Sequence, residues 1–467
     1  MALKKLLKSI LNVNCIKIKN VEFDRISSSV FIQVDVTKGQ KSRCPVCGKK
    51  CSGYDSTTEH RTWRSLDFGS CSVYVVSDVN RVHCPEHGVH TEQVPWAYHN
   101  SGFTREFEQQ VSYLTLHLNK TEVTKLMRIN WRTVGAILSR TKDRLEPDSS
   151  IRFKNLRRIG IDETSYRKGH KYVTVVLDHD TNQVVWVGKG TGKEVLNSFF
   201  EQLTQKQKES IELVSCDGAR WIQSCIEEWL PNCERCIDGF HVVQWTIDCM
   251  DELRKEVWRE AKQKKRGQPK RGRGRPKKGE EAKATTKYGK SYKYALGKNP
   301  ENLTEHQQSC LDEIKELYPK MFRGYQLKEG LRKVFQCSKD TIEKELKAWL
   351  SWACRSKLKP FVELSKKIRR HKDAIIATVK HGLSNARIES TNNKIKVLIR
   401  KSYGFRNIQN LIDMIMIVCS DLYHGIKLPY ELRWFYPHIV QKPHINWLIT
   451  IYPRIGENLG KIRNCES

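Results

Sequence analysis

The chain has 467 residues, of which 39% are hydrophobic and 29% are charged. This balance excludes a wholly disordered or membrane-embedded protein, and the length predicts several domains with a sizeable buried core. Lys and Arg exceed Asp and Glu by 31 charges, an excess that destabilises a compact fold unless a polyanion is bound. Nucleic acid is therefore the expected partner, and an acidic membrane surface is the second choice.

Cysteine usage and hydropathy indicate the class of protein. Sixteen cysteines, some with C-x-x-C spacing, favour metal binding and free core thiols over a secreted disulfide scaffold in a chain of this size. The basic stretch Met1–Asn14 is interrupted by Lys8 and has no cleavage site of a signal peptide. The longest apolar run, Leu411–Cys419, contains Asp413 and is too short to cross a bilayer. We expect a soluble intracellular protein without a membrane partner.

Hydrophobic periodicity predicts the elements in chain order. Residues 15–95 alternate with period two, as strands do, and residues 104–145 change to helical spacing. Between 157 and 245, we expect strands at Arg158–Asp162, Tyr172–Leu177, Val184–Val187, Ile211–Cys216 and Cys233–Ile237. Helices are expected at Glu194–Leu203, Ala219–Leu230 and His241–Trp258. A hairpin followed by α/β units predicts a mixed sheet with helices on its faces. Residues 301–425 are expected to be mostly helical.

Two short knuckles predict a structural zinc site. Cys44-Pro-Val-Cys47-Gly is followed, after 36 residues, by Cys84-Pro-Glu-His87-Gly. Each knuckle points two ligands at one ion, and together they supply a tetrahedral Cys3His set. The intervening strand-rich segment is expected to form a hairpin. Competing ligands are Cys51, Cys71 and His83, and Cys233 with Cys236 are expected to be core thiols.

Residues from Thr121 onward predict a helix-turn-helix. A first helix, a turn at Ile129-Asn130 and a second helix from Trp131 fit the motif. The second helix carries Arg132 and Arg140, which suit contacts to a DNA groove or to phosphates. The alternative is an ordinary helical hairpin in a core.

Three acids are candidates for a catalytic metal site. Asp162 and Asp217 are each expected to end a strand, and Glu389 lies in a predicted helix. Carboxylates at the ends of neighbouring strands point into one crevice, where their oxygens suit Mg²⁺. A single acid at such a place more often ends a strand at a turn, so only their combination indicates catalysis.

Several motifs together resemble the DDE transposases of bacterial insertion sequences, specifically the ISL-three family. The resemblance runs from about Cys44 to Tyr423. It rests on the two knuckles and on the stretches Val94-Pro-Trp-Ala, Gly160-Ile-Asp-Glu-Thr, Ser215-Cys-Asp-Gly, Asp238-Gly-Phe-His-Val, Ala386-Arg-Ile-Glu-Ser-Thr-Asn-Asn-Lys-Ile-Lys and Tyr403-Gly-Phe-Arg-Asn. The family implies an RNase H-like α/β core in which Asp162, Asp217 and Glu389 are the catalytic acids and bind two Mg²⁺ or Mn²⁺ ions. Glu163 and Asp238 are interpreted as supporting or structural acids.

The resemblance also predicts the domain organisation. We expect a β-rich zinc domain (1–100), a helix-turn-helix domain (101–150), a first part of the core (155–258), a basic linker with a helical insertion (259–375), and a second part of the core (376–425). Residues 426–467 are unassigned. The 172 positions between Asp217 and Glu389 leave room for the insertion.

Two basic features are expected to contact DNA. In the predicted helix of Glu389, Asn385, Asn393, Lys396 and Arg400 recur at intervals of three or four and form one polar stripe with it. Lys262–Lys278 contains ten Lys or Arg in seventeen residues, with Gly and Pro, and is expected to be disordered alone. Its centre resembles an AT-hook, whose arginines, Arg273 and Arg275 here, suit the minor groove of A·T tracts. A flexible basic linker is the equal alternative.

The sequence therefore predicts a transposase that binds double-stranded DNA at the inverted repeats of its element, cleaves the ends and joins them to target DNA. A homo-oligomer that pairs two ends is implied by this chemistry, and the resemblance implies a bacterial cytoplasmic protein associated with the nucleoid. The alternatives are a domesticated, non-catalytic DNA-binding regulator and a nuclease without strand transfer.

Overall fold

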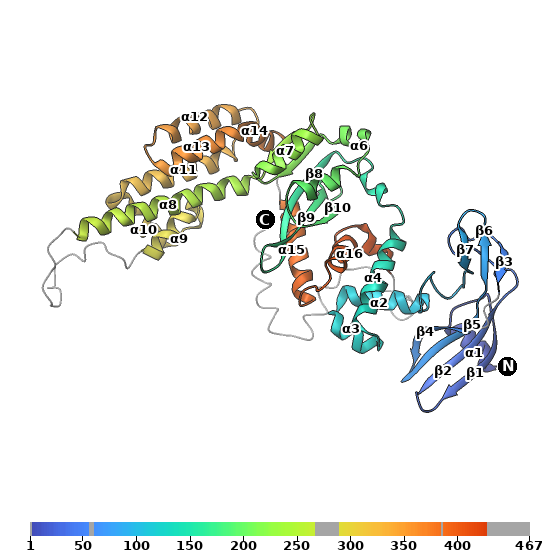
Figure 1. Ribbon diagram of the computed structural model, residues 1–467. Coiled ribbons are helices and arrows are strands. Elements are labelled where there is room, and N and C mark those ends of the chain that lie inside the picture. The colour runs from blue at the N-terminus through green and yellow to red at the C-terminus, as the bar shows by residue number, and fades with distance from the viewer. Residues whose placement is uncertain (1, 56–59, 267–288, 384–385, 427–467) are drawn as a thin grey trace, which may run out of the picture. The chain divides into compact units, whose positions relative to one another are not determined.

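The computed structural model describes residues 2–55, 60–266, 289–383 and 386–426, and Figure 1 labels most of their helices and strands. These residues form two compact units. Unit 1 contains residues up to 117 together with 125–129, and unit 2 contains 118–124 and 130–425. The residue boundaries of the five predicted modules stay predictions. The unassigned residues 427–467 lie outside the described residues, as do Arg273, Arg275 and Asn385.

A four-stranded sheet forms the core of unit 1. After helix α1 (Ala2–Ile10), strands β1 (Ile16–Asp24), β2 (Ser29–Val36), β4 (His60–Phe68) and β5 (Cys71–Asp78) pair in the order β1-β2-β5-β4, with β2 and β5 parallel. Ile32 and Val34 on β2, and Val73 and Val75 on β5, are buried on one face. This confirms the period-two alternation predicted for residues 15–95.

A second, three-stranded sheet carries the two knuckles. It consists of β3 (Ser52–Asp55), β6 (Arg81–Cys84) and β7 (Gly88–Thr91), in the order β3-β6-β7. Between the knuckles, β4 and β5 form an antiparallel pair, which confirms the predicted hairpin. Helix α2 (Arg105–His117) follows and buries Phe107 and Val111.

Helices α3 (Lys120–Met127) and α4 (Trp131–Leu145) occupy the predicted helix-turn-helix positions. The turn ends at Asn130, whose side-chain Oδ1 accepts a hydrogen bond from the backbone N–H of Thr133 at 3.0 Å. This N-cap satisfies one of the free donors of the first helical turn, and so fixes the start of α4 at Trp131. A short 3₁₀ helix (Ser149–Phe153) leads into the next sheet.

A five-stranded mixed sheet forms the centre of unit 2. Its order is β10-β9-β8-β11-β12. Its first three strands are antiparallel, and β11 and β12 are parallel to β8. All five strands lie where the sequence predicts strands: β8 (Arg158–Arg167), β9 (Lys171–Asp178), β10 (Gln183–Lys189), β11 (Leu213–Cys216) and β12 (Glu234–Ile237).

Helices cover both faces of this sheet. Helices α5 (Lys193–Phe200) and α7 (Arg220–Trp229) share a hydrophobic core with Ile159 and Ile161 of β8, and α6 (Gln205–Ser210) lies between them in sequence. Later in the chain, α15 (Ala386–Lys401) packs on β8, and α16 (Ile408–Val418) packs on β10 and α4. The 3₁₀ helix Asp421–Gly425 ends the described part of the unit.

The insertion between Asp217 and Glu389 is helical, as predicted, and has a hydrophobic core that is mostly its own. It consists of α8 (Gly239–Arg266), α9 (Gly289–Gly297), α10 (Glu305–Leu317), α11 (Pro319–Val334), α12 (Ile342–Arg355), α13 (Lys359–Arg370) and α14 (Lys372–His381), with a 3₁₀ turn at Pro300–Asn302. Helix α14 returns to the sheet, where the Thr378 hydroxyl bonds both the N–H and the C=O of Ile237 in β12.

The basic segment was predicted to be unfolded from its first residue, and this is wrong for Lys262–Arg266. These five residues form the last turn of α8. Lys, Arg and Gln favour helices, and the first helix breaker of the segment is Gly267, so the helix continues to the residue before it. The residues from Gly267 to Lys278 lie outside the described part.

No helix within the described residues is both long and apolar enough to cross a membrane.

Candidate active site and metal centre

The predicted zinc ligands form one cluster in unit 1. The Sγ atoms of Cys44, Cys47 and Cys84 and a ring nitrogen of His87 all lie within 4.8 Å of one another. Cys84 Sγ lies 3.5 Å from His87 Nδ1, and the His87 side chain lowers the pKa of the Cys84 thiol to about 6. Three soft sulfur donors and one imidazole fit a tetrahedral zinc ion. The alternatives Cys51, Cys71 and His83 are not members of this cluster.

Backbone contacts hold the two knuckles in place. In the first, the N–H of Gly48 donates to the C=O of Cys44 at 2.9 Å, and Gly48 has φ +69°, a conformation that suits glycine. The buried Glu92 carboxylate then accepts the backbone N–H groups of Ser42 and Asn80, at 2.7 and 2.9 Å. Glu92 therefore ties the loop before the first knuckle to the turn before β6, which carries Cys84.

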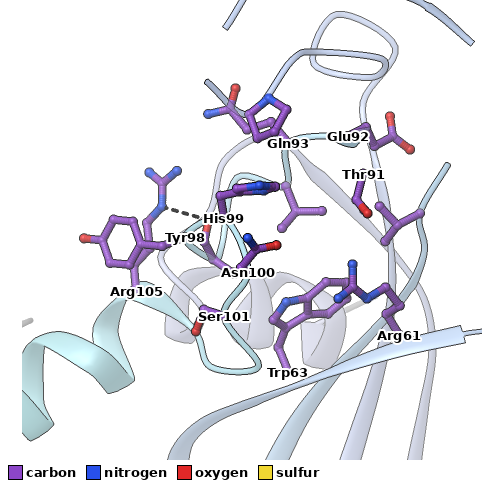
Figure 2. A pocket seen from close by; sticks show the side chains of 14 residues that line it. Arg61, Trp63, Thr91, Glu92, Gln93, Tyr98, His99, Asn100, Ser101 and Arg105 are labelled. Atoms are coloured by element: carbon purple, nitrogen blue, oxygen red, sulfur yellow. Dashed lines mark hydrogen bonds between the residues drawn. The ribbon is translucent and has the colours of Figure 1, made fainter. Parts of the chain in front are cut away.

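A small pocket lies beside this cluster in unit 1 (Figure 2). Its lining includes Pro45 next to the first ligand, together with Trp63, Glu92, His99 and Arg105, and its volume is 110 Å³. Figure 2 shows the hydrogen bond that Arg105 Nε donates to the C=O of Ala97 at 3.4 Å. The space holds a few water molecules and is too small for a nucleotide. It contains none of the predicted catalytic residues.

The two arginines of α4 that were predicted to contact DNA differ in exposure. Arg132 lies in the first turn of α4 and is exposed, whereas Arg140 is half-buried further along the helix. Val134, Ile137 and Leu138 are buried on the opposite side. Arg132 is therefore the better placed of the two for a contact outside the protein, because base contacts come from the N-terminal part of a recognition helix.

In unit 2, Asp162 lies in the middle of β8 and not at its end, which corrects the prediction. Ile159 and Ile161 face the core under α5 and α7, so the alternation of β8 turns Asp162 to the opposite face. Asp217 directly follows β11, as predicted. Since β11 runs parallel to β8 with Ser215 opposite Gly160, the same register continued to the next residues brings Asp217 level with Asp162.

Local hydrogen bonds orient both aspartates. One oxygen of Asp162 accepts the backbone N–H of Glu163 at 2.8 Å, and one oxygen of Asp217 accepts that of Ala219 at 2.9 Å. Gly218, which lies between Asp217 and Ala219, allows the close approach of α8, because a Cβ at this position would lie 2.5 Å from the Trp245 ring. The second oxygen of Asp162 accepts a 2.7 Å hydrogen bond from Asn392 Nδ2 of α15.

Helix α15 carries Glu389 and the predicted polar stripe. Its buried face contains Ile388, Asn392, Ile395 and Leu398, which pack toward β8. Glu389 is exposed, as are Asn393, Lys396 and Arg400. The Asn392–Asp162 hydrogen bond fixes the first turns of α15 beside the aspartates. The amphipathic pattern predicted for this helix is confirmed over the described residues, and the functions of its polar residues stay predictions.

Two further acids lie near Asp162, Asp217 and Glu389, and we refer to the five together as the acidic cluster. Asp238, at the start of α8, is buried, and its charge interacts with those of Asp217 and Glu389. Its Oδ1 accepts the N–H of Phe240 at 3.1 Å, and its Oδ2 lies 3.8 Å from His241 Nε2. Glu163 follows Asp162 and is half-buried. His241 and Asn392 were not among the predicted site residues, although both lie in stretches that carry the family resemblance.

Burial and crowding of like charges make the cluster a candidate cation site. Burial raises the pKa of Asp162 to about 6, that of Glu163 to about 7, and that of Asp238 above its usual range. Three buried oxygens have no hydrogen-bond partner among the described residues: Glu163 Oε1, Asp238 Oδ2 and Asn392 Oδ1. Oxygen donors of this kind fit a hard divalent cation.

The carboxylates are less tightly gathered than the zinc ligands. In the part of the chain that the structure describes, only the Cys3His group brings all of its ligand atoms within 4.8 Å of one another. Asp162, Asp217 and Glu389 lie on one side of the sheet, but their carboxylate oxygens are not all within 4.8 Å of one another.

Three family models match successive parts of the chain. Residues 40–87 match the zinc-finger of transposases IS204/IS1001/IS1096/IS1165, and residues 92–141 match the helix-turn-helix domain of transposase family ISL3. Residues 159–415, more than half of the chain, match the DDE transposase model of ISL3. The chain belongs to the ISL3 family of transposases. This confirms the predicted resemblance, and the matched ranges of this chain include the residues of the Cys3His cluster and the three acids.

Curated relatives agree with this assignment. The ISL3 chain is 41% identical over 423 residues to the transposase for insertion sequence element IS1557 of Mycobacterium tuberculosis, covering 88% of this chain and 94% of the relative. It is 26% identical over 372 residues to the transposase for IS1001 of Bordetella parapertussis, covering 78% and 85%. The chain is thus a DNA transposase with a zinc-finger domain, a helix-turn-helix domain and a DDE catalytic domain.

Proposed function

We propose that this transposase binds the terminal inverted repeats of its own insertion sequence and catalyses metal-dependent DNA cleavage and strand transfer. The observation that supports this best is the convergence of Asp162 and Asp217 on neighbouring parallel strands, with the Glu389 helix bonded to Asp162 through Asn392. These elements lie up to 230 positions apart in sequence. Their meeting on one face of a sheet provides a place for a phosphodiester.

The central sheet is proposed to be an RNase H-like core. Three antiparallel strands, β8 to β10, are followed by two strands parallel to β8, with helices on both faces. Asp162 on the first strand, Asp217 after the fourth and Glu389 on a later helix then occupy the catalytic positions of such a core. The helical insertion between the last two acids fits the same arrangement.

Asp162, Asp217 and Glu389 would hold the divalent ions, two Mg²⁺ or Mn²⁺ in this proposal. Once bound, such ions stabilise the attacking and the leaving oxygens of an in-line displacement. Asn392 keeps the Asp162 carboxylate oriented, and Asp217 is oriented by the N–H of Ala219. Asp238, whose buried Oδ2 has no hydrogen-bond partner among the described residues, adds negative charge that favours a cation at this place.

The chemistry consists of two phosphoryl transfers. In the first, water attacks the phosphorus at the end of the element, and the bond to the 3′ oxygen breaks, which frees a 3′-hydroxyl. In the second, this 3′-hydroxyl attacks a target phosphate, and a target 3′ oxygen leaves. The exposed Asn393, Lys396 and Arg400 extend from Glu389 along α15 and would contact the DNA backbone at the site.

The other modules are proposed to recognise the ends. A zinc ion held by Cys44, Cys47, Cys84 and His87 would stabilise the β-rich domain, and α4 would read the end DNA with Arg132 and, less directly, Arg140. A homo-oligomer that pairs two ends is proposed from the chemistry. We place its activity in the bacterial cytoplasm, at the nucleoid, because its substrate is the chromosome.

A strand-transfer assay with pre-cut ends tests the function against its two alternatives. We expect the full chain with Mg²⁺ to join a duplex that has a free 3′-hydroxyl at the element end to plasmid DNA. A nuclease would cut intact ends without joining pre-cut ones, and a non-catalytic regulator would bind the ends without either product. Absence of joined product under conditions where the ends are bound would contradict the proposal.

The basic segment is expected to contribute non-specific affinity. Residues 267–278 contain six Lys or Arg, and each phosphate contact adds about 0.9 to the salt slope of binding to duplex DNA. Deleting these residues should therefore lower the slope by several units while the preference for end DNA remains. The measurement is the binding constant of the full chain at several salt concentrations. An unchanged slope would exclude this segment from DNA binding.

A pair of substitutions tests the AT-hook resemblance separately. Replacing Arg273 and Arg275 with alanine should weaken binding to A·T-rich duplexes more than to G·C-rich ones, because a narrow minor groove attracts arginine. Lys277→Ala with Lys278→Ala is the charge-matched control and should weaken both duplexes equally. If the arginine pair weakens binding to both duplexes equally, the segment is a flexible basic linker and not an AT-hook.

A further inference from the structure

A basic hollow lies in unit 2 between the helix-turn-helix and the turn after α15. Two adjoining hollows, of 560 and 710 Å³, share Lys120, Trp131, Arg132 and Arg406 in their linings. The larger one also contains Arg167, the last residue of β8. No Asp or Glu lines either of them. We refer to the two together as the α4–α15 hollow.

The hollow is positively charged, and its cations lie close to an aromatic ring. Lys120 Nζ lies 3.7 Å from the centre of the Trp131 ring, and the guanidinium of Arg406 lies 5.7 Å from the same ring. Lys120 Nζ is buried without a hydrogen-bond partner among the described residues, and burial lowers its pKa to about 8. An ammonium group in this situation gains from an anion that enters the hollow.

An exposed aromatic residue stands at the rim of the hollow. Tyr403 is 87% exposed and has a left-handed backbone conformation with φ 52°, and Gly404 follows with φ 89°. Both residues line the larger hollow. Aromatic faces beside a row of cations are typical of surfaces that follow a nucleic-acid strand.

Two elements connect the hollow to the catalytic acids. On β8, Arg167 is five residues beyond Asp162, a distance of about 16 Å along an extended strand. On α15, the helix runs from Glu389 to Lys401 and leads directly into Ser402 and Tyr403 of the lining. A distance of about 16 Å corresponds to about five base pairs of duplex DNA.

Helix α4, the second helix of the helix-turn-helix, is fixed to the core through α16. Ser139 of α4 donates a 2.5 Å hydrogen bond to the buried Asp413 of α16, which also accepts a 2.9 Å bond from Gln409. Gly135 allows the close approach, because a Cβ there would lie 2.4 Å from Asn410 Nδ2. DNA that is bound at the start of α4 is therefore held at a constant spacing from the acids.

From this geometry we infer that the α4–α15 hollow binds backbone phosphates of the element's end DNA about five base pairs from the phosphate that is cleaved. It would thus set the distance between the recognised sequence and the cut. Arg167 and Arg406 supply exposed cations, and Lys120 supplies a buried one. The inference rests on the proposed cleavage of the ends and adds to it a phosphate-binding site outside the acids and outside the basic stripe of α15.

The test replaces the two exposed cations, Arg167→Gln with Arg406→Gln, in the full chain. Binding is measured without added divalent cation, to a duplex of the terminal repeat that flanks the coding region and to a scrambled duplex. Because two phosphate contacts are lost, the salt slope of the variant should be lower than that of wild type by about 1.8. The ratio of wild-type to variant affinity should therefore shrink about tenfold between 50 and 200 mM salt. Lys206→Gln with Lys347→Gln, two exposed cations elsewhere in unit 2, is the matched control and should change the slope little.

Phosphate ethylation then locates the contacts. In the wild-type complex, ethylation of phosphates about five base pairs from the cleavage position should interfere with binding. In the arginine variant this interference should disappear, while interference at more distant phosphates remains. The inference would be overturned if the arginine variant kept the wild-type salt slope, or if the control pair lowered the slope equally. It would also be overturned if the variant lost ethylation interference only at phosphates other than those about five base pairs from the cleavage position. If the wild-type chain does not prefer the terminal repeat, the proposed function fails instead.

Discussion

Replacing Asp162 or Asp217 with asparagine, or Glu389 with glutamine, is expected to abolish both end cleavage and strand transfer while end binding is retained. Each carboxylate is proposed to hold metal ions that neutralise charge in the same transition state, a contribution of several kcal/mol. A loss of that size corresponds to a rate below about one thousandth of wild type. The measurement is cleavage of an end duplex and joining of a pre-cut end, each at saturating protein.

The three acids should also behave as one unit. Once a single ligand is lost the site is disabled, so Asp162→Asn with Asp217→Asn should be little worse than either change alone. Asp340→Asn is a matched control, because Asp340 is an exposed acid between α11 and α12 and should not affect either step. If any single variant keeps end cleavage within about tenfold of wild type, or about 1.4 kcal/mol, that residue does not hold the metal.

Loss of a zinc ligand is expected to have the second largest effect. Cys44→Ser or His87→Ala should release the zinc and unfold the β-rich domain, because metal-binding energy in such small modules is also folding energy. Cys44 is buried in the cluster, and the three-stranded sheet that carries the knuckles has only short strands. Specific binding to the end DNA should fall, while the core of unit 2 remains folded.

Elemental analysis and limited proteolysis of the full chain measure this prediction. Wild type should contain one zinc per chain, and the variants should contain none and be cut rapidly before residue 100 while the core resists. Cys71→Ser is the matched control, since Cys71 is a half-buried cysteine outside the cluster. A wild-type protein purified without chelator and lacking zinc would contradict the assignment.

Local pattern predicted most of the elements of this fold. The period-two runs became β2 and β5, and the Asn130 cap placed the start of α4 where the sequence predicts it. The end of β8 was missed, because the polar run from Glu163 to Arg167 has little hydrophobic signal. Those residues belong to the strand because they pair with β9, and this pairing cannot be predicted from the local sequence alone.

The candidate site depended on contacts that local pattern could not provide. The hydrogen bond between Asn392 and Asp162 joins residues 230 positions apart, and Asp238 meets Glu389 only after the helical insertion returns to β12. Position along the chain made the three acids candidates, but their catalytic role came from the family resemblance, since a single acid at a strand end is common. His241 and Asn392 could have been suspected only from their place in the same motifs.

The most direct test of the central claim is to locate the divalent metal on the protein. Fe²⁺ is bound in place of Mg²⁺ in the complex with end DNA, and hydroxyl radicals generated at the iron cut the nearby backbone. The account predicts cuts around Asp162, Asp217 and Glu389 that disappear in Asp217→Asn and when excess Mg²⁺ is added. Cuts that are confined to other parts of the chain, or that persist unchanged in this variant, would contradict a shared metal site at the three acids.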